Sequence, residues 1–200
     1  MPDIEFTKEE YHLLNDYQFF DLKASITSKV LHLFSNIEDR IRSGIKAEFC
    51  QIPEKIAATP AKISKGENYQ KCPYIVLDYP RVYSREKIFA YRTIFWWGHY
   101  FSNAMIIGGQ AYHQYLPRIL EIAGELKNRD WYLCVYRTPW KLENLPWNYV
   151  PFSHLSNEHI RDHLQKYPFI KIARIYALDH YKDLGRDTVH FLTDLMNLIS

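Results

Sequence analysis

Ile88–Trp97, which reads IFAYRTIFWW, is the stretch that decides the fold. Alternate side chains are apolar on both faces, with Ile94 and Trp96 on one face and Phe95 and Trp97 on the other. A strand of this kind is usually covered on both sides, or covered on one side and near a pocket on the other. The stretch therefore predicts a buried strand whose aromatic side chains serve mainly as core.

A hairpin is predicted directly after this strand. Gly98 and His99 suit a two-residue type II′ turn, because the first position of that turn needs a positive φ. The chain would then return antiparallel over Tyr100–Ile107 and end at Gly108. On this interpretation His99 is a turn residue, and the alternative is an aromatic binding site that contains it.

The flanking segments add helices and further strands. A capping box at Thr7–Glu10 predicts a first short helix. Apolar residues spaced by three and four predict a longer helix over 21–44 with one apolar face; they are Leu22, Ile26, Val30, Leu33, Ile37 and Ile41. Further strands are predicted between Pro73 and Pro80, over 131–137 and over 169–178. Further helices are predicted over 110–128, from Ser156 to about 166, and at the C-terminus. Pro117 is expected in the first turn of the helix over 110–128.

The order of these elements shows no regular alternation of strand and helix and no repeat. It predicts an α+β fold over residues 1–200, as a single domain. We expect a mainly antiparallel sheet of about five strands with helices packed on it.

Composition and charge narrow the class of protein. The formal net charge of +2 is spread along the chain, so no basic stripe predicts nucleic-acid binding. No apolar run reaches the roughly 20 residues of a membrane span, and the acidic start at Met1–Glu5 lacks a secretory signal. Three separated cysteines, Cys50, Cys72 and Cys134, favour reduced thiols and a cytoplasmic protein.

No standard catalytic or phosphate-binding motif is present, which leaves an enzyme possible and the cofactor unknown. Charged residues within or at the ends of apolar strands are the first candidates, namely Asp78, Arg92, Arg137 and Arg174. A charge inside a sheet needs a partner. Either a structural ion pair satisfies them, or two arginines hold a carboxylate or phosphate ligand.

Three other segments carry candidate side chains. The loop at Lys65–Tyr69 offers Glu67 and Tyr69 as an acid and a phenol, although such a run is often only a solvated turn. His159 and His163 share a helix face, but without a third ligand we predict no metal site. The long loop 138–151 carries Trp140 and Trp147, which either bind a ligand or pin the loop to the domain.

Three motifs resemble a family of short, uncharacterised bacterial cytoplasmic proteins. They are Gly66–Tyr69 (GENY), Leu77–Arg81 (LDYPR) and Phe95–Phe101 (FWWGHYF), and the similar region covers about a quarter of the chain. The resemblance implies a bacterial origin. It transfers no catalytic residues, because the family carries no assigned activity.

The sequence therefore predicts a cytoplasmic protein that binds a small anionic ligand or a peptide. The ligand would be held by Arg92 and Arg137 with a tryptophan nearby. The predicted binding residues are Glu67, Tyr69, Asp78, Arg92, His99, Arg137, Trp140 and Trp147. One alternative is an enzyme that uses Glu67, Asp78 or His99 as acid or base. Another is an assembly protein whose many aromatic residues form an oligomer interface. The sequence does not predict the oligomeric state.

Overall fold

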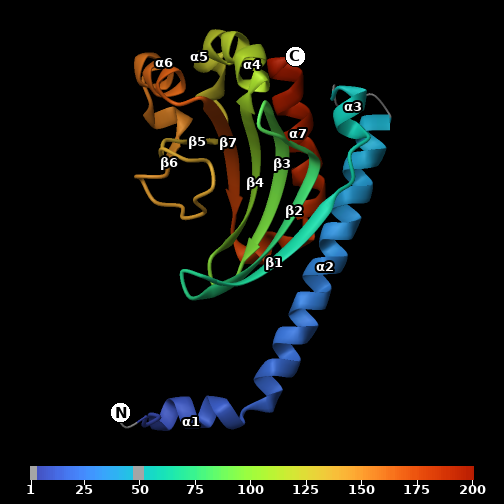
Figure 1. Cartoon of the computed structure of the whole chain (residues 1–200), viewed down its shortest axis with the longest axis vertical. Helices are drawn as coiled ribbons and strands as arrows, with labels where there is room; N and C mark the ends of the chain where they lie inside the picture. Colours follow the sequence, from blue (N-terminus) through green and yellow to red (C-terminus); the bar gives the residue numbers. More distant parts are fainter. Residues whose placement is uncertain (1–3, 47–51) are drawn as a thin grey trace.

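The computed structural model describes residues 4–46 and 52–200, and within these ranges seven strands form one antiparallel sheet (Figure 1). The strands are β1 (Lys62–Tyr69), β2 (Cys72–Tyr83), β3 (Lys87–Trp96), β4 (Tyr100–Gly109), β5 (Tyr132–Cys134), β6 (Tyr149–Pro151) and β7 (Phe169–Tyr176). Their order across the sheet is β1-β2-β3-β4-β7-β5-β6. The predicted α+β class and antiparallel sheet are confirmed, with two strands more than the five expected.

The two additional strands lie where the sequence predicts loops. β1 is polar and lies at one edge of the sheet, so it shows no apolar alternation. The turn into β2 places Gln70 and Lys71 at φ values of 51° and 66°, the left-handed region that usually calls for glycine or asparagine. Gln and Lys are not typical of such a turn, so the sequence did not predict this hairpin. The prediction of a loop at 65–69 was wrong.

The helices are α1 (Lys8–Asn15), α2 (Tyr17–Lys46), α3 (Glu54–Ala57), α4 (Gln110–Glu121), α5 (Ala123–Leu126), α6 (Asn157–Lys166) and α7 (Leu184–Ile199), with short 3-10 helices η1 (Phe152–His154) and η2 (Leu178–Lys182). Residues of α2, α4 and α7 pack in the main core on one face of the sheet. The capping box of α1 is confirmed, with Thr7 and Glu10 bonded reciprocally. The apolar face of α2 is confirmed from Val30 onward, although the helix begins at Tyr17 rather than Asp21.

Pro117 departs from the prediction, because it lies inside α4 rather than in its first turn. An interior proline costs about 3 kcal/mol of helix stability. Tyr112, Tyr115 and Ile119 of the same helix are buried, and packing of this face against the sheet offsets that cost. Tertiary packing therefore outweighs local propensity at this position.

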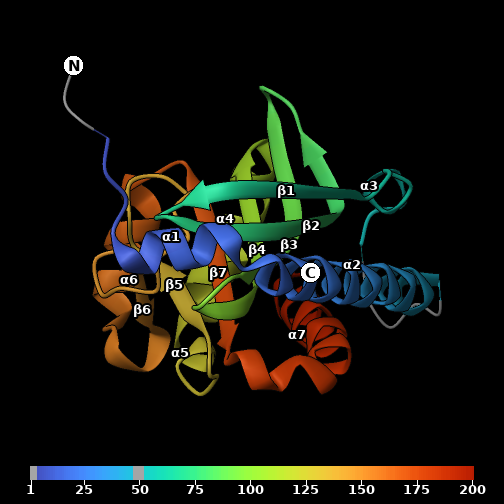
Figure 2. The same ribbon diagram turned by 90° about the horizontal axis from the view of Figure 1, so that it is seen from below.

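The two faces of β3 are covered by different parts of the chain. Phe89, Tyr91 and Phe95 belong to the main core, together with buried residues of α2, α4 and α7. Figure 2 shows α2 and α7 on one side of the sheet. On the opposite face, Ile94 and Trp96 pack with Leu142 from the segment between β5 and β6. The prediction of a strand apolar on both faces is confirmed, and one of its covers is a loop.

The β3–β4 connection is one residue longer than predicted. Trp96 pairs with Tyr100, so Trp97, Gly98 and His99 form a three-residue loop instead of a two-residue turn. Gly98 has a φ of 69° and occupies the third position of a turn closed by the bond from the His99 N–H to the Trp96 carbonyl. The need for glycine was correctly predicted, and the turn type was wrong.

Candidate functional site

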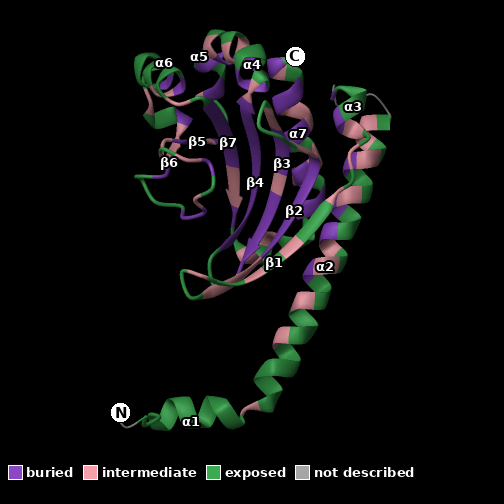
Figure 3. Cartoon of the chain, viewed as in Figure 1, coloured by how far each residue is buried: buried purple, intermediate pink, exposed green. Residues whose placement is uncertain are grey.

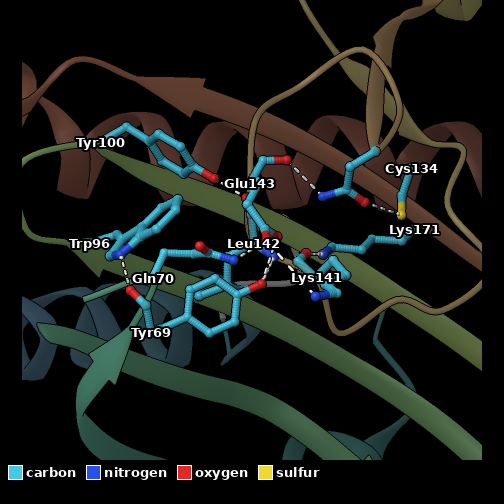
Figure 4. Close-up of polar contacts among 10 residues, drawn as sticks. Tyr69, Gln70, Trp96, Tyr100, Cys134, Lys141, Leu142, Glu143 and Lys171 are labelled. Carbon is cyan, nitrogen blue, oxygen red and sulfur yellow. Dashed lines mark hydrogen bonds and ion pairs between the residues drawn. The ribbon is translucent and has the colours of Figure 1, made fainter. Parts of the chain in front are cut away.

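The face of the sheet away from the helices carries a loop, residues 135–148, that is tied down by a buried lysine (Figure 4). Lys171 of β7 is 1% exposed, and its Nζ donates to the carbonyl oxygens of Pro139 at 2.7 Å and Lys141 at 2.9 Å. Burial lowers the pKa of Lys171 to about 8. The amine thus fixes the path of the loop across the sheet.

Glu143 projects from this loop toward the β1–β2 turn. Its carboxylate accepts hydrogen bonds from the Tyr69 hydroxyl at 2.6 Å and from the Gln70 amide at 3.0 Å, and the Lys141 ammonium lies 3.9 Å away. Burial alone would raise the pKa of Glu143, but these donors and the lysine outweigh burial, and the pKa is lowered. The side chain is therefore an ionised carboxylate, although the residue is only 7% exposed.

Tyr69 remains protonated beside this carboxylate. Burial, and then its hydrogen bond to Glu143, raise the pKa of Tyr69 to about 12. Its oxygen also accepts a bond from the Leu142 N–H at 3.2 Å. The phenol therefore acts as a donor that orients the carboxylate, and not as a base.

Aromatic rings form the wall next to Glu143. The His99 ring stacks on Trp96 with centroids 3.6 Å apart, and the Trp96 indole donates to the Tyr69 carbonyl at 3.3 Å. The Tyr100 hydroxyl donates to the Leu142 carbonyl, and burial raises the pKa of that phenol. The hairpin tip thereby contributes a rigid aromatic surface to the site.

These groups line a cavity of about 660 Å³. Its walls include Gln70, Trp96, His99, Tyr100, Glu143 and Trp147. Trp147 is 45% exposed and packs against Tyr136 with centroids 5.2 Å apart. Among the described residues that line this cavity there is one carboxylate and no lysine or arginine.

Three of the eight predicted binding residues belong to this site. His99 and Trp147 line the cavity, and Tyr69 supports it through Glu143. Their convergence joins two segments that the sequence analysis treated separately, the GENY region and the Trp-rich loop.

A second group of predicted residues lies apart from the cavity. Arg92 donates to both carboxylate oxygens of Asp78, at 2.7 Å and 2.9 Å, and to the Tyr83 hydroxyl at 3.2 Å. Asp78 and Arg92 are direct cross-strand partners, and the guanidinium lies 5.5 Å from the Trp140 ring centroid. Of the two alternatives, a structural ion pair or an anion site, the geometry of this cluster matches the structural ion pair.

The remaining two predicted residues are exposed. Glu67 accepts a bond from Lys23 at 2.8 Å, which, with the charge of that lysine, lowers the pKa of the carboxyl. Arg137 lies over the Tyr136 ring at 5.7 Å. Neither Arg92 nor Arg137 lines the cavity, so the two arginines are not brought together there.

The sequence analysis missed Glu143 and Lys171. Lys171 is one of two charged residues, with Arg174, in the otherwise apolar strand Phe169–Tyr176, so the criterion that selected Arg92 would also have selected it. Glu143 offered no such signal, because its role depends on a loop conformation set by distant contacts.

No cluster of three or more metal-ligating side chains occurs among residues 4–46 and 52–200. His159 is exposed, whereas the His163 ring is partly buried against Tyr167 at 5.1 Å. Burial lowers the pKa of His163. Cys72 and Cys134 are free thiols, and Cys50 lies outside the described residues.

In the part of the chain that the structure describes, no helix has the length and apolar character needed to cross a membrane. No protein-family model, curated protein or solved structure matches this chain. The resemblance of its three motifs to a bacterial family stays a prediction.

Proposed function

We propose that the chain is a cytoplasmic module that binds a small molecule or a peptide in the cavity between Glu143, His99 and Trp147. The observation that carries the proposal is an ionised, nearly buried carboxylate in the wall of an aromatic cavity. Concave sites with aromatic walls and a few oriented polar groups are typical ligand sites. The free thiols at Cys72 and Cys134 are consistent with the proposed location.

The charges favour a cationic group on the ligand over the anionic ligand expected from the sequence. The exposed Trp147 ring can attract a cation, and Glu143 supplies the only formal charge among the described lining residues. Arg92, which was expected to hold an anion, is already paired with Asp78. An ammonium or guanidinium group, including the side chain of a basic peptide, has the matching chemistry.

Catalysis is the weaker candidate, because two of its three proposed acid–base groups are occupied. Glu67 is paired with Lys23, and Asp78 is paired with Arg92. His99 alone of the three lines the cavity. Binding without turnover therefore fits the geometry better.

Replacing Glu143 by glutamine is expected to weaken binding of a cationic probe by about tenfold, because the charge-assisted part of the contact is lost. The probe is N-acetylarginine amide, and binding is followed by the NMR shifts of the indole N–H groups. The glutamine keeps an acceptor for the Tyr69 hydroxyl, so the fold should be retained.

Two controls make this test selective. Glu125→Gln changes an exposed carboxylate on α5 that does not line the cavity, and it should bind as the wild type does. N-acetylglutamate amide is the anionic probe of similar length. Stronger binding of that anion, or unchanged arginine-amide binding by Glu143→Gln, would refute the proposal.

A further inference from the structure

The N-terminal arm, residues 4–26, extends from the body of the molecule (Figure 1). No residue of α1 is buried, and the buried residues of α2 begin at Val30. Figure 3 shows the contrast between the exposed arm and the buried strands. Apart from the contact of Lys23 with Glu67, the arm is thus mostly helix that the rest of the chain leaves uncovered.

The arm is exposed but not polar. Of the 16 large hydrophobic residues that are exposed in the described ranges, ten lie in the arm. They are Ile4, Phe6, Tyr11, Leu13, Leu14, Tyr17, Phe19, Phe20, Leu22 and Ile26. Such a concentration on a helical arm marks an interaction surface.

The apolar face of α2 is continuous across the boundary of the body. Phe19, Leu22 and Ile26 precede Val30 at spacings of three and four, so they extend the stripe that is buried farther along the helix. Phe6 before α1, Leu14 of α1 and Phe20 of α2 border an apolar cleft of about 270 Å³. The apolar stripe of α2 is therefore buried from Val30 onward and exposed before it.

An apolar groove lies at the base of the arm, on the body of the molecule. It has a volume of about 490 Å³ and is bordered by residues of α2, the β3–β4 hairpin and η2. Its walls include Leu33, Trp97, Phe101 and Tyr181, together with Ile26, the last residue of the chain's own arm. Each chain thus carries both an uncovered apolar arm and an uncovered apolar groove.

Charge favours a second copy of the chain as the occupant. Residues 1–26 carry six carboxylates and two lysines, a net charge of −4, whereas residues 27–200 carry 23 basic and 17 acidic residues, a net charge of +6. Lys29, which is basic, is the only charged residue among the described residues that line the groove. An acidic arm is suited to the basic body of another copy and poorly suited to an anionic lipid surface.

The area is also sufficient for a stable dimer. The exposed fractions of the ten arm residues amount to roughly six complete side chains, which is on the order of 1,000 Å² of surface. A standard protein interface needs roughly 800 Å² from each partner. Reciprocal docking closes the assembly at two copies, because arm and groove are used once in each chain.

We propose that two copies of the chain exchange their N-terminal arms, so that the apolar face of each arm packs in the groove of the other copy. The interface lies on α2, η2 and the hairpin, and Gly98 is the one residue that its groove shares with the described lining of the ligand cavity. Glu143 and Trp147 do not border the groove, so either proposal can fail without the other.

Sedimentation equilibrium of the full chain tests this exchange. The wild type is expected to show a reversible change from 24.0 kDa monomer to dimer at micromolar concentration. A Phe20→Asp/Leu22→Asp variant should weaken dimerisation by about tenfold or more, because charges replace buried apolar contacts. Both residues are exposed in the single chain, so its fold should be unaffected.

Two further variants separate arm exchange from other arrangements. Tyr181→Asp, in the groove, should weaken the dimer as the arm variant does. Gln18→Asp adds a single negative charge, as Tyr181→Asp does, at another exposed position of the arm and should leave the dimer largely intact.

Four results would overturn the proposal. They are a monomeric wild type at every concentration, a dimer that survives the arm variant, a dimer that survives Tyr181→Asp, and loss of the dimer in the Gln18→Asp control. Binding of a monomeric wild type to phosphatidylserine vesicles would also overturn it, by identifying a membrane as the occupant.

Discussion

Replacing Arg92 by methionine is expected to lower the free energy of unfolding by about 3–5 kcal/mol, because Asp78 would be left as a buried carboxylate without a counter-charge. Asp78 is 5% exposed and accepts both of its short hydrogen bonds from Arg92. Urea denaturation at neutral pH measures the change. Binding of N-acetylarginine amide should be unaffected in the folded variant, since Arg92 does not line the cavity.

Two variants control for this result. In Asp78→Asn/Arg92→Met the charge is removed from both sides of the pair, and much of the lost stability should return. Arg85→Met changes an exposed arginine beside the β2–β3 turn and should alter stability by no more than about 0.5 kcal/mol. A loss below about 1 kcal/mol for Arg92→Met would contradict the structural role of the pair.

Replacing Lys171 by methionine is expected to cost about 2–4 kcal/mol and to loosen the loop 135–148, because the Pro139 and Lys141 carbonyls would lose their buried donor. The loop carries Glu143 and Trp147, so cationic-probe binding should fall with it. Denaturation and limited proteolysis within the loop measure the two effects. Lys62→Met, at an exposed position of β1, is the matched control and should change neither. A stable variant with a protected loop would contradict the assignment.

The same residue predicts a pH dependence. Its pKa is about 8 in the folded protein and 10.5 in an unfolded chain, so between these values the unfolded state binds more protons. The stability contributed by neutral Lys171 is present above about pH 10.5 and is lost as the pH falls through about 8. Relative to Lys171→Met, the wild type should therefore gain stability as the pH rises from about 8 to about 10. A constant difference across that range would contradict the lowered pKa.

The elements that could be predicted from the sequence are those with a strong hydrophobic pattern. The stretch Ile88–Trp97 shows two apolar faces, and the structure covers one with helices and the other with a loop. The face of α2 repeats over many turns, so its period was clear. β1 was missed because an edge strand needs no apolar alternation, and its turn lacks the residues that usually adopt a positive φ.

The site could be predicted only in part, because its contacts are long-range. Tyr69 and Glu143 are 74 residues apart, and their hydrogen bond depends on the course of the loop, which Lys171 and Tyr100 help to set. The sequence analysis identified His99, Tyr69 and Trp147 as unusual side chains. It placed the ligand charge on Arg92 instead, because strand register, which pairs that arginine with Asp78, cannot be inferred from spacing alone.

A crystal structure of the protein soaked in N-acetylarginine amide tests the central proposal most directly. The proposal predicts the guanidinium against the Glu143 carboxylate, with the Trp147 and His99 rings beside it. Density for the compound beside Arg92 or Arg137, or an empty cavity at a soaking concentration above the dissociation constant measured by NMR, would contradict the proposal.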